Sequence, residues 1–134
     1  MALFRERHLP GRAAAMAECE RRLEALAARP GGLLGRSCSG TLAAGGKRLR
    51  PLLVFLSARH GAPPDEKVFA AAVAVELVHM ATLVHDDVLD RAELRRGRPT
   101  LYARHGAGVS AAAGDYLFAT AFRVLAAAGS RPAA

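Results

Sequence analysis

The sequence predicts an all-α protein, a helical bundle. Alanine is abundant, tryptophan is absent and only 5% of residues are aromatic, a composition that favours helices over strands. Apolar residues recur at helical spacing in several segments, and no segment has the strict alternation of a half-buried strand. The run from Val68 to Val84 is apolar at all but three positions. A helix that is apolar nearly all round must be buried, so this run predicts the central helix of the bundle.

Three helical segments are predicted before the central helix. Residues 12–29 have an amphipathic pattern that Pro30 and the glycines after it should end. Residues 33–44 contain several glycines and serines, so we expect a helix only in their second half. The Gly45-Gly46 turn should open a helix over residues 52–59 with Pro51 in its first position, where no amide donor is needed.

The long central helix should begin at Pro64-Asp65-Glu66, where proline and acidic residues suit a helix N-terminus, and should end near Asp90. Residues 91–100 are predicted to be a charged connector without strands. A short helical piece over residues 101–105 follows, and Gly106 and Gly108 should separate it from a last helix over residues 109–128.

Length and composition indicate one globular domain of 134 residues with a net charge of +7, carried by 17 arginines and 2 lysines. Such a charge suits nucleic acid, an anionic membrane or a phosphorylated small molecule. The arginines lie near glycines and acidic residues, which favours phosphate, because guanidinium binds phosphate oxygens through a planar fork. No aromatic residues are interleaved with the arginines, so nucleic acid is the least favoured partner.

The cysteines and the apolar run bear on location. Cys19 and Cys38 have no metal-ligand spacing, so we expect two reduced thiols in a cytoplasmic protein. The N-terminal residues contain no apolar signal core. The run over residues 68–84 is short for a membrane span and leads directly into acidic residues. We therefore expect no stable insertion into a membrane.

Three aspartates at the end of the central helix form the candidate metal site. At 100° per residue, Asp86 and Asp90 share one helical face and Asp87 lies at its flank. Carboxylates this close repel one another, and a bound cation would relieve that repulsion. Magnesium suits such a site, because it takes carboxylate oxygens and keeps positions open for substrate phosphates. The alternative is a solvated helix end with no ligand.

Glu76 and His79 extend the face of Asp86 and Asp90 into a polar stripe. His79 is equally compatible with a phosphate donor and with a hydrogen-bonded core histidine. His85 points elsewhere, and we expect it to pack and hydrogen-bond within the fold.

Two basic clusters flank the acidic motif. One lies at the Gly-Gly turn before a helix, an arrangement that suits oxyanion binding, and comprises Lys47, Arg48 and Arg50. The other, Arg95 and Arg96, follows the acidic motif. Either cluster alone could be a solvated basic loop, but both beside one metal motif indicate two phosphorylated groups.

These motifs resemble the trans-isoprenyl diphosphate synthase (polyprenyl synthetase) family. The similarity runs from about residue 33 to 125. Its three most specific segments are Gly-Gly-Lys-Arg-Leu-Arg-Pro at 45–51, residues 76–90 with the Arg-Arg-Gly-Arg-Pro-Thr of 95–100, and Gly-Asp-Tyr-Leu-Phe at 114–118. The resemblance implies the N-terminal portion of the isoprenoid synthase fold.

The resemblance also implies a reaction and roles for individual residues. Isopentenyl diphosphate would condense with an allylic diphosphate, with Mg²⁺ as the cofactor. Asp86 and Asp90, helped by Asp87, would hold Mg²⁺ on the allylic diphosphate, which Arg95 would also contact. The diphosphate of isopentenyl diphosphate would be held by four side chains: Lys47, Arg50, His79 and Arg96. Ala81 and Thr82, one turn before Asp86, are small, which is similar to members that make medium or long chains.

The sequence departs from the family pattern in one respect. Family members are more than twice as long and carry a second aspartate-rich motif, which these 134 residues lack. We therefore expect residues 1–134 to be one incomplete domain, inactive alone, that associates as a homo- or hetero-oligomer. Two interpretations stay open: the N-terminal half of a prenyltransferase, or a non-catalytic or regulatory short subunit that needs a partner of the same fold.

Overall fold

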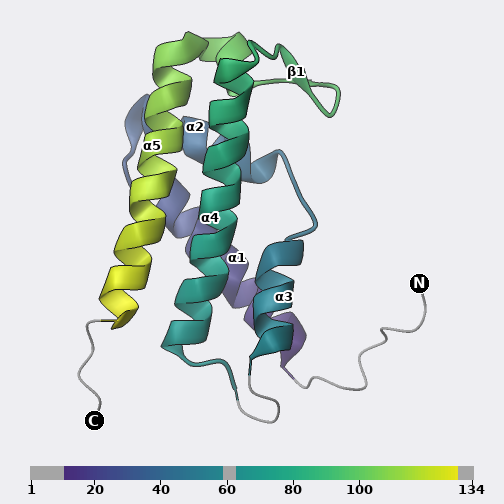
Figure 1. Cartoon of the computed structure of the whole chain (residues 1–134), viewed down its shortest axis with the longest axis vertical. Helices are drawn as coiled ribbons and strands as arrows, with labels where there is room; N and C mark the ends of the chain where they lie inside the picture. The colour runs from purple at the N-terminus through teal and green to yellow at the C-terminus, as the bar shows by residue number, and fades with distance from the viewer. Residues whose placement is uncertain (1–10, 59–62, 130–134) are drawn as a thin grey trace.

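A computed structural model describes residues 11–58 and 63–129, which form five helices and one two-stranded hairpin (Figure 1). The helices are α1 (Arg12–Ala28), α2 (Gly32–Ala43), α3 (Leu49–Ser57), α4 (Glu66–Leu89) and α5 (Leu101–Gly129). The strands are β1 (Leu94–Arg95) and β2 (Arg98–Pro99). Within these residues the predicted helical class is confirmed.

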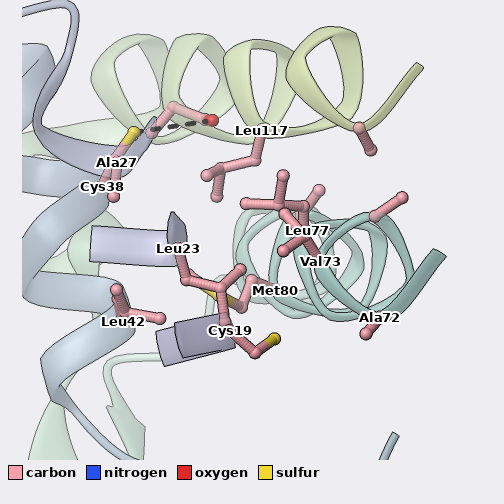
Figure 2. Packing of buried hydrophobic residues seen from close by; sticks show 14 of the residues in the cluster. Cys19, Leu23, Ala27, Cys38, Leu42, Ala72, Val73, Leu77, Met80 and Leu117 are labelled. Carbon is pink, nitrogen blue, oxygen red and sulfur yellow. Dashed lines mark hydrogen bonds between the residues drawn. The ribbon is translucent and has the colours of Figure 1, made fainter. Parts of the chain in front are cut away.

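Helix α4 is the centre of the bundle, as its apolar sequence predicts. It runs beside α5, with α3 against it and α1 behind it (Figure 1). The core is built from fully buried leucines on three helices, Leu23 of α1, Leu77 of α4 and Leu117 of α5 (Figure 2). Both cysteines are free and buried within this core, and the thiol of Cys38 donates to the carbonyl of Ala113.

Helix α2 is longer than predicted, because it is helical from Gly32 onward. The reason is tertiary packing. Gly35 is buried against α1, so closely that a Cβ atom there would lie 3.0 Å from the carbonyl oxygen of Ala28. The glycine that weakens the local helical signal is therefore the residue that lets α1 and α2 approach.

Helix α4 begins where the sequence predicts, whereas α3 begins earlier than predicted. Helix α3 begins at Leu49, so Pro51 is its third residue, not its first. This is still within the first turn, where amide groups have no intrahelical acceptor. The predicted last residue of this helix, Arg59, lies outside the described residues. Helix α4 begins as predicted, and the Asp65 carboxylate accepts from the Val68 amide at 2.9 Å.

The connector after α4 differs from the prediction, because it contains a short antiparallel hairpin. Arg96 and Gly97 form the turn, with φ of 51° and 74°. Positive φ at both central residues is typical of the tightest hairpin turns, and a glycine at the second position is their usual signal. That signal was present in the sequence at Gly97. Helix α5 then includes both predicted helical pieces, with a kink at Gly106 (φ 81°).

One described helix, α4, is long and apolar enough to cross a membrane by length and composition. Half of its most apolar window is buried within the fold. Central helices of water-soluble bundles have the same length and composition, and α4 has packed neighbours on several sides.

Candidate functional site

The last turn of α4 presents two exposed carboxylates. Asp86 and Asp90 are both exposed, and the amide of Asp90 donates to the carbonyl of Asp86 at 2.8 Å, which ends the helix. Neither carboxylate has a side-chain hydrogen bond or ion pair with the described residues. They are therefore available to a ligand on one face of the helix, as their spacing predicts.

Asp87 has a different environment. It is buried, and its carboxylate accepts from the Arg95 guanidinium at 2.8 Å. The hydrogen bond to Asp87, followed by the charges of Asp87, Asp86 and Asp90, raises the pKa of Arg95. The sequence spacing predicts Asp87 at the flank of the acidic face. In the structure its carboxylate points toward Arg95, and this pair connects β1 to the end of α4.

Thr100 closes the base of this hairpin. Its hydroxyl donates to the carbonyl of Ala92 at 2.6 Å and accepts from the amide of Ala103 at 3.0 Å. Thr100 is buried and caps the start of α5. The hairpin therefore holds Arg96 at an exposed turn close to the acidic end of α4.

The basic turn before α3 is anchored by its middle arginine. Arg48 has a φ of 51° and only 12% of its side chain exposed. Its guanidinium donates to Glu20 of α1 at 2.9 and 3.0 Å, to the Leu42 carbonyl of α2 at 2.8 Å and to Glu76 of α4 at 3.5 Å. Sequence reasoning grouped Arg48 with the anion-binding residues, but its side chain is used in holding helices together.

The other two basic residues of this turn face outward. Lys47 and Arg50 are exposed, and within the described part of the chain neither forms a side-chain hydrogen bond or ion pair. Arg50 also borders a groove between α3 and α4 that is lined mainly by apolar side chains such as Leu53 and Val75. These two cations are free to bind an anion beside that groove.

His79 is influenced by charges from both basic segments. It is half-buried on α4, and burial, followed by the positive charge of Arg50 and then those of Arg95 and Arg96, lowers its pKa, while Glu76 opposes this effect. Cations from both basic segments therefore act on one imidazole, although Arg50 and Arg96 are 46 positions apart in the sequence.

Glu76 does not belong to the exposed polar stripe that helical spacing suggested. It is 4% exposed and paired with Arg48, so the stripe consists of His79, Asp86 and Asp90. The prediction for His85 is confirmed. Its Nε2 lies 3.0 Å from the Asp115 carboxylate, and its ring packs on Phe118 of α5.

The donor set fits magnesium. No group of three or more His, Cys, Asp or Glu side chains within residues 11–58 and 63–129 could hold a metal ion by itself. Two exposed carboxylates, Asp86 and Asp90, supply hard oxygen ligands. Magnesium is commonly bound through one or two carboxylates, with waters and substrate phosphates completing its coordination.

The model of the polyprenyl synthetase family matches residues 32–134, a range that contains both basic segments and the acidic end of α4. The chain belongs to the polyprenyl synthetase family. Component 2 of heptaprenyl diphosphate synthase from Geobacillus stearothermophilus is 46% identical over 115 residues, which are 86% of this chain and 36% of that protein. The nonaprenyl diphosphate synthase of Mycobacterium tuberculosis is 52% identical over 64% of this chain and 26% of its own length.

Solved structures of polyprenyl synthetases have the same fold. The heptaprenyl diphosphate synthase of Staphylococcus aureus is 35% identical, with a TM-score of 0.81 over 90% of this chain and 38% of that one. The geranylgeranyl pyrophosphate synthetase of Geoglobus acetivorans gives a TM-score of 0.75 at 37% identity, over 88% of this chain and 39% of that one. This chain therefore spans about a third of the length of the relatives it matches, and the isoprenoid synthase fold is shown for that portion.

Proposed function

We propose that this chain is the N-terminal part of a prenyl diphosphate synthase that condenses isopentenyl diphosphate with an allylic diphosphate. One observation supports this most directly. His79 lies within the electrostatic influence of Arg50 in the first turn of α3 and of Arg95 and Arg96 in the hairpin. Asp86 and Asp90, whose carboxylates pair with no described side chain, follow it on α4. Cations for two diphosphates and carboxylates for a metal thus lie along one helix.

The residues of the proposed site divide into two sets by chemistry. Lys47, Arg50, His79 and Arg96 donate hydrogen bonds or carry positive charge, and we assign them to the diphosphate of isopentenyl diphosphate. Asp86 and Asp90 supply oxygen ligands for magnesium. Bound magnesium would offset the negative charge of the allylic diphosphate as it leaves. Asp87 orients Arg95 toward that diphosphate, since Nη1 of Arg95 is not used in the pair with Asp87.

The proposed product is a medium or long chain. Thr82 is exposed on the Asp86 side of α4, and its hydroxyl donates to the His79 carbonyl at 2.7 Å. Ala81 is fully buried and faces the core instead. Of the two small residues before the acidic motif, Thr82 is therefore the one that borders the substrate side, and its small size leaves room there for a growing chain. We place this activity in the cytoplasm, as expected from the sequence.

A second candidate is a short subunit that needs a partner of the same fold. Two relatives, at 46% and 42% identity, are named component 2 of heptaprenyl diphosphate synthase, and this chain matches about a third of each. No second acid cluster occurs in the described ranges 11–58 and 63–129. In both candidates we expect residues 1–134 to act within a homo- or hetero-oligomer.

The test is magnesium-dependent binding of an allylic diphosphate, measured by calorimetry. Asp86→Asn should weaken this binding by at least about tenfold, because it removes one of two metal ligands. Glu24→Gln is the matched control, since it removes an exposed carboxylate from α1. Equal binding by wild type and Asp86→Asn would overturn the metal assignment. Turnover of both substrates by this chain alone would rule out the need for a partner.

A further inference from the structure

Arg48 is the most extensively bonded arginine of the basic turn. It joins three other elements through one guanidinium: Glu20 on α1, the Leu42 carbonyl at the end of α2, and Glu76 on α4. Its pKa is raised, first by the hydrogen bond to Glu20 and then by the charges of Glu20 and Glu76 against the effect of burial. The residue immediately before α3 is therefore tied to the rest of the bundle by its side chain.

The backbone of the turn depends on this side chain. Gly46 has a φ of 149°, and a Cβ atom there would lie 3.1 Å from Nη1 of Arg48. The guanidinium thus folds back against Gly46, and a side chain at position 46 would have to displace it by a few tenths of an ångström. Arg48 itself has a left-handed φ of 51°, a conformation that non-glycine residues adopt at a cost unless surrounding contacts hold them in it.

The strongest anchor is Glu20. Both of its carboxylate oxygens accept from Arg48, at 2.9 and 3.0 Å, whereas Glu76 accepts once, at 3.5 Å. The other oxygen of Glu76 is buried and has no hydrogen-bond partner among the described residues. Glu20 also lies before residues 32–134, which the family model matches. A residue outside the recognisable motifs therefore holds the first of them in place.

We propose that Arg48 and Glu20 are positioning residues, which hold the turn at residues 45–50 so that Lys47 and Arg50 project together toward a diphosphate. Arg48 does not touch the ligand in this arrangement. Its contribution is to remove the conformational freedom that Lys47 and Arg50 would otherwise lose on binding. The inference rests on the proposed function, because it assumes that Lys47 and Arg50 bind a diphosphate.

Substitutions at Glu20 distinguish a positioning role from a purely electrostatic one, because the two predict opposite changes in the affinity for pyrophosphate. Glu20→Leu removes a negative charge near a site for anions, so electrostatics alone predicts tighter binding of inorganic pyrophosphate. Loss of the anchor predicts weaker binding, by about tenfold. Glu24→Leu, at an exposed position of the same helix, removes the same charge without touching Arg48. It should leave the affinity unchanged or slightly increased.

The experiment is calorimetric titration of inorganic pyrophosphate into the full chain and its variants. Lys47→Met, with the exposed Arg29→Met as its control, tests the proposed diphosphate site itself. If Lys47→Met leaves the affinity unchanged, or wild type does not bind, the proposed site fails and the inference fails with it. If Lys47→Met weakens binding but Glu20→Leu does not, the proposed site stands and the positioning role is overturned.

Two further variants and one measurement guard against unfolding as the cause. Glu20→Gln keeps one hydrogen-bond acceptor for Arg48 and should lose less affinity than Glu20→Leu. Arg48→Lys keeps the positive charge but lacks the planar fork, so it should weaken binding about as much as Glu20→Leu. Amide hydrogen exchange should become faster in Glu20→Leu at Gly45 and Leu52, whose amides donate to the carbonyls of Leu42 and Arg48, while core amides of α4 stay protected. Unchanged exchange in the turn would contradict the proposal.

Discussion

The two basic segments beside α4, the turn before α3 and the hairpin after α4, have similar anchoring pairs but differ in how many contacts hold them. In each, one arginine pairs with a buried carboxylate of α4, Arg48 with Glu76 and Arg95 with Asp87. In each, the neighbouring cations point outward. The Arg48 side chain is only 12% exposed and is bonded to three elements, whereas that of Arg95 is 40% exposed and is bonded to α4 alone.

This difference separates a fixed binding surface from an adjustable one. The turn before α3 is part of the packing between helices, so Lys47 and Arg50 have a defined position before any ligand arrives. The hairpin after α4 is attached through Asp87 and Thr100 at its base, and its turn residue Arg96 extends from it. We therefore expect the first segment to resist perturbation and the second to move toward its ligand.

The largest effect should come from removing the arginine of the fixed segment. Arg48→Met leaves the buried carboxylate of Glu76 without its partner, and we expect it to lower the free energy of unfolding by about 3 kcal/mol. Urea unfolding followed by circular dichroism measures this. Lys67→Met, which removes an exposed cation from α4, should change stability by less than about 0.5 kcal/mol. A loss below about 1 kcal/mol for Arg48→Met would remove the distinction between the two segments.

A smaller loss should follow at the adjustable segment. Arg95→Met should lower the free energy of unfolding by about 1 kcal/mol, because the Arg95 side chain is 40% exposed, so that water can take its place and reach the Asp87 carboxylate. Arg98→Met is the control, because Arg98 is the cross-strand neighbour of Arg95 and is exposed. The same urea experiment applies. If Arg95→Met were as damaging as Arg48→Met, both segments would be equally fixed.

The smallest effect concerns the histidine between the segments. Burial and positive charges lower the pKa of His79, with Arg50 the strongest of the charges. Removing a positive charge favours protonation, so the pKa should rise in Arg50→Met and rise less in Arg96→Met. An NMR titration of the imidazole measures both, with Arg29→Met as a remote control. A larger rise in Arg96→Met would mean that the hairpin, not the fixed turn, lies nearer to His79.

The pH dependence of stability at His79 has a definite sign. Its pKa in the folded protein lies below the ordinary value of about 6.5. The unfolded chain therefore binds the proton of His79 more tightly than the folded protein does. The stability that depends on neutral His79 is fully present above about pH 6.5. It is lost as the pH falls through the lower pKa of the folded state.

Local patterns predicted the features that depend on neighbours in the sequence. The amphipathic spacing of residues 12–29, the cap at Asp65 and the shared face of Asp86 and Asp90 all depend on residues within one or two turns of each other. The packing role of His85 also follows from its helical position. It lies so close to Gly114 that any side chain at position 114 would collide with the imidazole, which explains the glycine of the Gly-Asp-Tyr-Leu-Phe segment.

Features that depend on distant residues could not be predicted in this way. Glu76 has the right spacing for the polar stripe, but Arg48, 28 positions earlier, draws it into a buried pair. The start of α2 depends on the contact between Gly35 and Ala28 across a turn. Whether Arg48 is a ligand-binding or an anchoring residue is decided by Glu20, and nothing in the basic motif refers to α1.

The end of α4 has a further electrical consequence. The helix dipole places a partial negative charge at this terminus, which adds to the carboxylates of Asp86 and Asp90, while Arg95 and Arg96 lie close by with the opposite sign. Under the proposed function, a free diphosphate is repelled by the helix end and a free cation by the arginines. A metal–diphosphate complex presents the matching charge to each. The surface thus favours the metal–diphosphate complex, whose net charge is smaller than that of the free diphosphate. Added salt should therefore weaken binding of the complex far less than it weakens binding of the free diphosphate or the free cation.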